Sequence, residues 1–191
     1  MIWRVNWTRA DAWLRSHAPE LHAKFLPPAT AADVAAAEEA IGAPLPADLA
    51  AWWTACGGLE EADYAPLVPE FYSPFGVGRA LEVREMTMRI RREVAVDPRV
   101  GDVDSYEARK LGEPAGSLIG DLWLPLFVPI AVSASGSYLF VDLREGPLHG
   151  CVMPFDNVEG ADEEPLWENV AAMLAGVAEW LEGDFLAEWR P

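Results

Sequence analysis

The sequence contains few of the residues that build disulfide frameworks, metal centres or membrane spans. It has 2 cysteines, Cys56 and Cys151, and 3 histidines in 191 residues. Two cysteines so far apart form no disulfide framework, and we expect both to be buried, reduced thiols. The longest apolar stretch, 122–134, contains two prolines and is shorter than the about 20 residues that a membrane-spanning helix needs. The N-terminus also lacks the apolar core of a signal peptide. We therefore expect a cytoplasmic protein that does not enter a membrane.

Basic residues are scarce as well. The chain has 14 Lys and Arg against 31 Asp and Glu, which gives a net charge of −17. Nucleic-acid binding depends on basic contacts with phosphate, and docking on anionic lipid also needs positive charge. The charge therefore excludes a general nucleic-acid binder and a protein of anionic membrane surfaces. The hydrophobic share of 51% and the length predict a folded chain with one domain over 1–191.

Motifs for catalysis, cofactors and metals are missing too. His17 and His22 are five positions apart, so they do not share a helix face as a pair of metal ligands would. No phosphate-binding glycine loop and no nucleophile elbow occurs. His149 and Cys151 would share one face of a strand, but no third group orients them, and a core thiol is the simpler interpretation. We predict no catalytic residue, no cofactor and no metal site, and hence a protein that is not an enzyme.

The patterns that are present predict an α+β fold with a central, largely antiparallel sheet flanked by helices. The expected elements are helices over 8–25, 30–42, 46–56, 79–94 and 166–186, and strands near 71–72 and over 122–132, 138–143 and 148–153. Short turns between the last three strands imply an antiparallel meander. Thr8 and Thr30 are the expected N-caps of the first two helices. Trp52 and Trp53 lie about 100° apart on one helix, so both cannot face the core squarely. Packing in the core or at its edge is the favoured interpretation, and a surface-accessible tryptophan that anchors a partner is the alternative. Residues 95–121 show no clear period.

Charged clusters are the remaining features of the sequence. The four arginines of 84–92 alternate with glutamates, which predicts an exposed, salt-bridged helix face. The acidic clusters allow two interpretations, a solvated surface or a patch that attracts a cationic partner. If they bind a partner, the residues involved are Glu60, Glu61, Asp63, Glu159, Asp162, Glu163 and Glu164.

The order of several short motifs resembles the SUKH superfamily, which includes fungal cell-wall-synthesis regulators and bacterial immunity proteins. In the first half, over 26–58, the motifs are Ile41-Gly42, Leu45-Pro46-Ala47-Asp48, Trp52-Trp53 and Gly57-Gly58. In the second half, over 120–185, they are Trp123-Leu124-Pro125, Gly136 before Tyr138–Asp142, Gly150-Cys151-Val152 and the closing helix. The glycine turn departs from the common Gly-Asp of the superfamily, because Ser137 follows Gly136.

The resemblance implies a single SUKH-like domain with a helical N-terminal extension over 1–25 and an insertion over 79–121. It implies no catalytic residues. Bacterial members are often immunity proteins for polymorphic toxins, many of them nucleases. An acidic protein suits a basic nuclease, since complementary charge speeds encounter. The resemblance thus implies an immunity protein that binds a cognate toxin domain; the alternative is a cytoplasmic regulatory scaffold like the fungal relatives.

Overall fold

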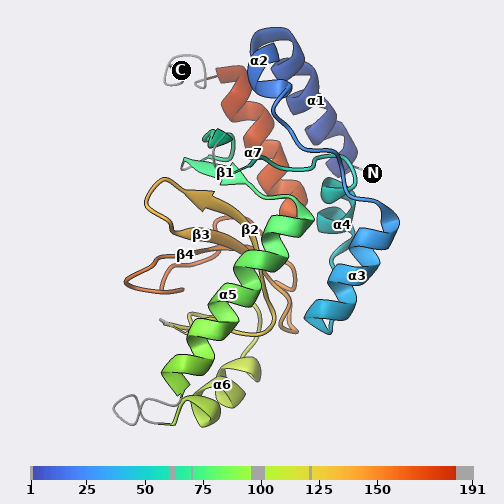
Figure 1. The fold of residues 1–191 in the computed structure, drawn as a ribbon. Helices are drawn as coiled ribbons and strands as arrows, with labels where there is room; N and C mark the ends of the chain where they lie inside the picture. The colour runs from blue at the N-terminus through green and yellow to red at the C-terminus, as the bar shows by residue number, and fades with distance from the viewer. Residues whose placement is uncertain (1, 61–62, 70, 96–101, 121, 184–191) are drawn as a thin grey trace.

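The computed structural model describes residues 2–60, 63–69, 71–95, 102–120 and 122–183. In this part of the chain the helices are α1 (Ile2–His17), α2 (Pro19–His22), α3 (Ala31–Ile41), α4 (Ala47–Trp53), α5 (Val77–Ala95), α6 (Val103–Leu111) and α7 (Val170–Gly183). The strands are β1 (Tyr72–Pro74), β2 (Phe127–Ser133), β3 (Tyr138–Asp142) and β4 (Val152–Phe155). Figure 1 shows α1 and α7 at one end of the molecule, α6 at the other end, and the strands between them.

The four strands form one sheet in the order β1-β2-β3-β4, and every neighbouring pair is antiparallel. The predicted α+β class and the predicted meander are therefore confirmed. A short turn connects β2 to β3 and places Gly136 at φ 87°, whereas the longer segment 143–151 connects β3 to β4. A side chain at that φ is strained, which explains the glycine in the turn. A register shift between Pro129 and Ala131 places Ile130 and Ala131 in the same core cluster.

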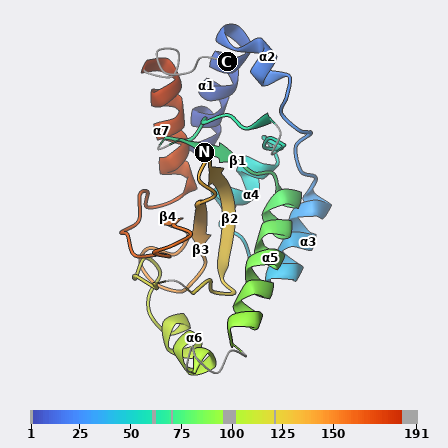
Figure 2. The same cartoon turned by 60° about the vertical axis from the view of Figure 1, so that its left-hand side comes forward.

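The sheet has a hydrophobic core on each of its two faces. Side chains alternate along β3, so Leu139 and Val141 pack in the larger core, and Phe140 packs in a second, smaller core. Helices α1, α3, α4, α5 and α7 contribute to the larger core (Figure 2). Helix α6 and, after it, residues 112–120 and 122–124 cover the smaller core. Each face of the sheet thus carries a hydrophobic core, which is why the strands are continuous apolar runs.

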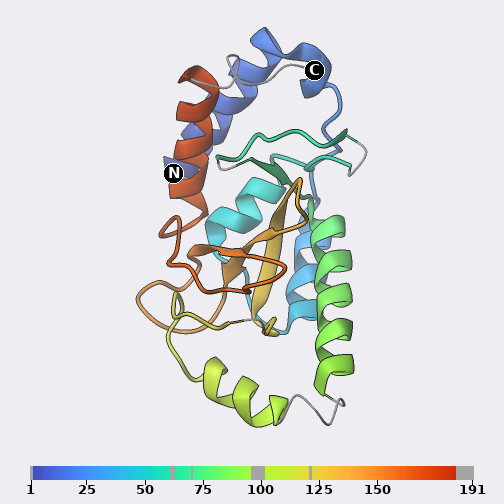
Figure 3. The ribbon, with the colours of Figure 1, turned by 90° about the vertical axis from the view of Figure 1, so that its left-hand side faces the viewer.

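The N-terminal helix packs along the C-terminal helix, and the views from two sides agree (Figures 1 and 3). Trp7, Ala10 and Leu14 supply the buried face of α1 at helical spacing. The predicted N-cap at Thr8 is wrong, because this apolar face begins before it and the helix starts at Ile2. The predicted continuous helix to residue 25 is also wrong, because Pro19 interrupts it.

The favoured interpretation of the two adjacent tryptophans, packing in the core, is confirmed, and the alternative of a surface-accessible tryptophan is wrong. Trp52 and Trp53 are 1% and 0% exposed. Helix α4 is short and has neighbours on more than one side: the Trp52 ring lies 6.5 Å from the ring of Trp7, and the Trp53 indole N–H donates to the carbonyl of Phe75. In a helix with neighbours on several sides, side chains that point in different directions are all buried.

Other elements differ from the expectations at their edges. The Thr30 cap of α3 is confirmed as a capping box with Asp33. The strand expected over 148–153 lies at Val152–Phe155, because Gly150 turns the chain at φ 87°. Residues 95–121, which showed no period, contain α6, whose N-cap Asp102 accepts a hydrogen bond from the backbone N–H of Ser105.

Candidate functional site

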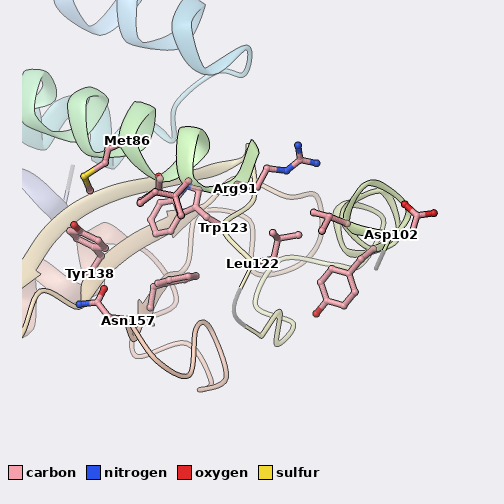
Figure 4. A pocket seen from close by; sticks show the side chains of 12 residues that line it. Met86, Arg91, Asp102, Leu122, Trp123, Tyr138 and Asn157 are labelled. Atoms are coloured by element: carbon pink, nitrogen blue, oxygen red, sulfur yellow. The ribbon is translucent and has the colours of Figure 1, made fainter. Parts of the chain in front are cut away.

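A cavity of about 660 Å³ lies between α5, α6 and the face of the sheet that carries the smaller core (Figure 4). This volume is within the range of binding sites for small ligands or inserted side chains. Met86 on α5 faces Tyr138 and Asn157 across the hollow, and Asp102 stands at its far end. The lining residues are Met86, Thr87, Ile90, Arg91, Asp102, Val103, Tyr106, Leu122, Trp123, Tyr138, Phe155 and Asn157.

An aromatic cluster around Trp123 forms the floor of the cavity. The Trp123 ring lies 5.0–6.2 Å from the rings of Phe127, Tyr138, Phe140 and Phe155, and Trp123 itself is 3% exposed. Edge-on contacts of this kind add to the burial energy of the rings. The floor is therefore closely packed, and its outer members Tyr138 and Phe155 remain partly exposed.

The α6 wall of the cavity is held by polar contacts. Arg91 on α5 pairs with Asp104 at 2.8 Å and with Glu107 at 2.6 Å, both on α6. The hydroxyl of Tyr106 donates to the carbonyl of Ile119. The Arg91 side chain is 13% exposed. These contacts neutralise the arginine that lines the cavity, so its charge is not free for a ligand.

A buried ion pair fastens α6 and the segment after it to the sheet. Asp142 and Arg144 have 0% exposed side chains, and the closest pair of atoms is 2.7 Å apart. The Arg144 guanidinium also donates to the carbonyls of Lys110 and Ser117, at 3.0 and 2.9 Å. Asp142 accepts a further bond from the backbone N–H of Gly116. One pair thus joins three segments behind the cavity.

The predicted salt-bridged arginine face is confirmed only in part. Arg91 makes ion pairs, but they cross from α5 to α6. Arg84 instead donates to the backbone carbonyls of Ala40, Ile41 and Pro125, and its burial lowers the pKa of its guanidinium. It connects α5 to the end of α3 and to the entry of β2. Its role is structural.

The second predicted acidic group lies beside the cavity, on the loop 156–164, which we call the acidic turn. Glu159, Asp162, Glu163 and Glu164 are all exposed on it. Asn157, which lines the cavity, belongs to the same turn. A smaller hollow of about 230 Å³ on this loop is lined by Glu159, Asp162 and Glu163 together with serines of the β2–β3 turn. The acidic turn therefore forms one rim of the candidate site.

Asp156 stabilises the acidic turn. Its carboxylate accepts hydrogen bonds from the backbone N–H groups of Val158 and Glu159, at 2.7 and 3.2 Å, and from the Ser137 hydroxyl at 2.9 Å. These bonds, that of Val158 foremost, lower the pKa of Asp156. Backbone bonds between Ala161 and residues 119–120 anchor the other side of the turn. The carboxylates of the rim are thus held by a defined backbone.

The first predicted acidic group, around residue 60, has different neighbours. Glu60 is exposed, and Asp63 pairs with Lys24 at 2.9 Å. Glu61 lies outside the described residues. This group follows α4 and contacts the segment after α2, whereas the acidic turn contacts 119–120 and the β2–β3 turn. The structure therefore places the two predicted acidic groups in different surroundings.

The residues considered for catalysis are placed in structural roles. Burial raises the pKa of the Cys151 thiol to about 12, and the same cause raises that of Cys56 to about 12. Both are free cysteines and buried, as expected. A thiol with so high a pKa carries almost no thiolate at neutral pH and is a poor nucleophile. His149 makes its hydrogen bond, through Nδ1, with the carbonyl oxygen of Arg144.

Within 2–60, 63–69, 71–95, 102–120 and 122–183, no group of three or more His, Cys, Asp and Glu is placed to hold a metal ion. In the same ranges no helix is long and apolar enough to cross a membrane.

The cavity residues are the part of the site that the sequence reasoning missed. A signal was present in β3, where Tyr138 and Phe140 alternate and so share a face. Ile90 lies between arginines in the sequence, and the structure shows that its side chain is 49% exposed and lines the cavity. The enclosure of this face by α5 and α6 depends on tertiary packing, and no local sequence pattern predicts it.

The antiparallel sheet carries most of its helices on one face, and on the other face an aromatic cavity opens beside α6 and the acidic turn. This arrangement defines an α+β domain with a surface suited to binding. The model of the SMI1 / KNR4 family (SUKH-1) matches residues 28–176, and the chain belongs to this family. This match confirms the SUKH resemblance, and it spans both halves of the motif series. A search of curated proteins found no match. Membership supports a protein-binding role of the toxin-immunity or SMI1/KNR4-like kind.

Proposed function

We propose that this protein is a non-enzymatic immunity protein of the cytoplasm that binds and neutralises a cognate polymorphic toxin with a basic, nuclease-type toxin domain. The observation that carries the proposal is the net charge of −17 with exposed carboxylates on the acidic turn, beside an apolar cavity, in a SUKH-1 family member. Complementary charge raises association rates and disfavours wrong partners. An inhibitor that must reach its toxin before damage is done benefits from a fast encounter.

The domain boundaries are part of the same proposal. We assign one SUKH-like domain to 1–191, with residues 1–25 as a helical extension and 79–121 as an insertion. The family match begins at residue 28, after α1 and α2, which is consistent with an added N-terminal element. Helix α1 packs on α7, so the extension would support the closing helix of the domain.

The test is to co-express the chain with a basic toxin domain encoded beside it. We expect an equimolar complex, loss of nuclease activity when the two proteins are equimolar, and survival of cells that carry both. Association should slow steeply as salt rises, since exposed charges are screened. Several weakly bound cellular proteins and no protection from the toxin would overturn the proposal. That result would favour the regulatory scaffold instead.

Charge variants test which carboxylates take part. Neutralising Glu159, Asp162 and Glu163 together should slow association and flatten its salt dependence. Neutralising Glu20, Glu39 and Glu179, which are exposed on α2, α3 and α7, changes the net charge equally and should have the smaller effect. The Glu60 and Asp63 pair, in different surroundings, is tested in the same way. Equal effects of all sets would show that only the net charge matters and would remove these residues from the interface.

A further inference from the structure

The cavity beside the acidic turn leaves several apolar side chains partly open to solvent. Ile90 is 49% exposed, and Met86, Tyr106, Tyr138 and Phe155 are partly exposed around the same hollow. Aromatic residues and methionine are enriched at the centres of protein interfaces, and a contiguous apolar hollow rimmed by polar residues is typical of a binding site. The hollow is therefore suited to an inserted apolar side chain.

The basic side chains at the cavity are paired with carboxylates. Arg109 and Lys110, which lie over the ring of the lining residue Tyr106, pair with Glu113. The cavity's single basic lining residue, Arg91, is already paired with Asp104 and Glu107. Asp102 stands at one end, and Asp156 adjoins Asn157 at the other. Hydrogen bonds from Ser105 and from Val158, respectively, lower the pKa values of these two aspartates, so both stay ionised at neutral pH. An acidic occupant would be repelled from both ends.

We propose that the cavity receives an apolar anchor side chain from a basic partner segment. Lysine or arginine residues on the two sides of the anchor would face Asp102 at one end and the acidic turn at the other. This inference rests on the proposed function and specifies the part of the partner that is recognised. A second copy of the chain, with a net charge of −17, would be repelled, and a neutral lipophilic ligand would leave the flanking carboxylates unused. A basic segment with an apolar anchor complements both the apolar cavity and the carboxylates beside it.

The probe is a peptide selected from a library of short random sequences displayed on phage, with the full chain as bait. The test variant is Ile90→Glu, which places a carboxylate in the mouth of the cavity and takes no part in the selection. Phe71→Glu is the matched control, because Phe71 is 54% exposed, takes the same change of charge and packs on Trp180 of α7 instead of lining the cavity. Thermal melting verifies that both variants fold. If Ile90→Glu melts early, Met86→Gln replaces it.

We expect the selected peptides to share one apolar residue with lysine or arginine on both sides. Replacing the apolar residue by serine, or using Ile90→Glu as the target, should weaken binding at least about tenfold, as for a buried anchor. Phe71→Glu should bind like the parent. The indole N–H signal of Trp123, assigned with Trp123→Phe, should shift in the nitrogen–proton spectrum when peptide is added, because this ring forms the cavity floor.

Several results would overturn the inference. They are selected peptides without basic residues, equal binding to both glutamate variants, or an unmoved Trp123 signal. A dimer of the chain that Ile90→Glu dissociates would assign the cavity to a second copy instead. A toxin that Ile90→Glu neutralises as well as the parent does would refute this inference and leave the proposed function standing. Peptides bound at the cavity, with no toxin neutralised, would refute the proposed function and leave this inference standing.

Discussion

Replacing Arg144 by methionine should destabilise the protein more than any change at a surface ion pair. The substitution keeps an unbranched side chain in the site but removes the guanidinium. It leaves the Asp142 carboxylate, which is 0% exposed, without its charge partner, and it leaves the carbonyls of Lys110 and Ser117 without their side-chain donor. Removing one member of a buried pair costs about 3–5 kcal/mol, since the other charge remains buried and uncompensated.

This loss is a large part of the stability of an ordinary domain, which is about 5–15 kcal/mol. For a chain of this size, it corresponds to a fall in Tm of about 6–20 °C. Urea unfolding gives the free energy, and hydrogen exchange gives the location of the effect. The backbone N–H groups of Ala115 and Gly116, which bond to Glu145 and to Asp142, should exchange faster in the variant than those of α3.

Two further variants separate the ion pair from packing. Asp142→Asn combined with Arg144→Met should cost less than the sum of the two single changes, by about 2–3 kcal/mol, because the double variant has no uncompensated charge. Arg9→Met removes an exposed pair with Glu182 and serves as the control, with an unfolding midpoint close to that of the parent. Additive costs, or an Arg144→Met variant as stable as Arg9→Met, would refute the reasoning.

Three other predictions concern backbone space, thiols and pH. Gly76→Ala should destabilise the fold severely, since an added Cβ would lie 1.9 Å from the carbonyl oxygen of Gly57. Gly78→Ala in α5 places its Cβ in open space and should raise the free energy of unfolding by up to about 1 kcal/mol. Urea unfolding of both variants checks this. Because the pKa values of both thiols are raised to about 12, a thiol reagent at pH 8 should label neither Cys56 nor Cys151 in the native protein but both after unfolding; rapid native labelling would contradict the structure. Hydrogen bonds in the folded protein lower the pKa values of several carboxylates, so the unfolded chain binds more protons in acid than the folded one. The stabilisation should be fully present at neutral pH and should be lost between about pH 5 and 3. Unfolding free energies that stay constant over this pH range would contradict the prediction. These carboxylates are Asp33, Asp102, Glu113 and Asp156.

The motif residues on which the family resemblance rests have structural roles in this protein. Asp48, from the Leu-Pro-x-Asp motif, accepts a hydrogen bond from the backbone N–H of Ala171 in the first turn of α7. Asp142, from the motif that forms β3, makes the buried pair with Arg144. Gly57 leaves space for the backbone of Leu26 and Pro27, and Gly58 leaves space for the backbone of residues 74–76. These residues could identify the fold from the sequence because they hold distant segments together.

The sequence by itself determined those features that depend on neighbours along the chain. The capping box of Thr30 and Asp33, the left-handed Gly42 that ends α3 and the turn at Gly136 all follow from local chemistry. So does the antiparallel pairing of β2 with β3, because a short turn leaves few other arrangements. The charge of −17 likewise needs no structure.

The tertiary structure alone decided features that depend on residues far apart in the sequence. It buried both Trp52 and Trp53, because α4 has neighbours on several sides. The two acidic groups are similar in sequence, but the tertiary structure gives them different surroundings. Asp63 pairs with Lys24, whereas the acidic turn lies beside a cavity. That cavity exists because α5, α6 and the sheet converge, and the burial energy that brings them together is summed over many distant contacts. A local pattern records which side chains are apolar, but only packing determines which of them remain open to a partner.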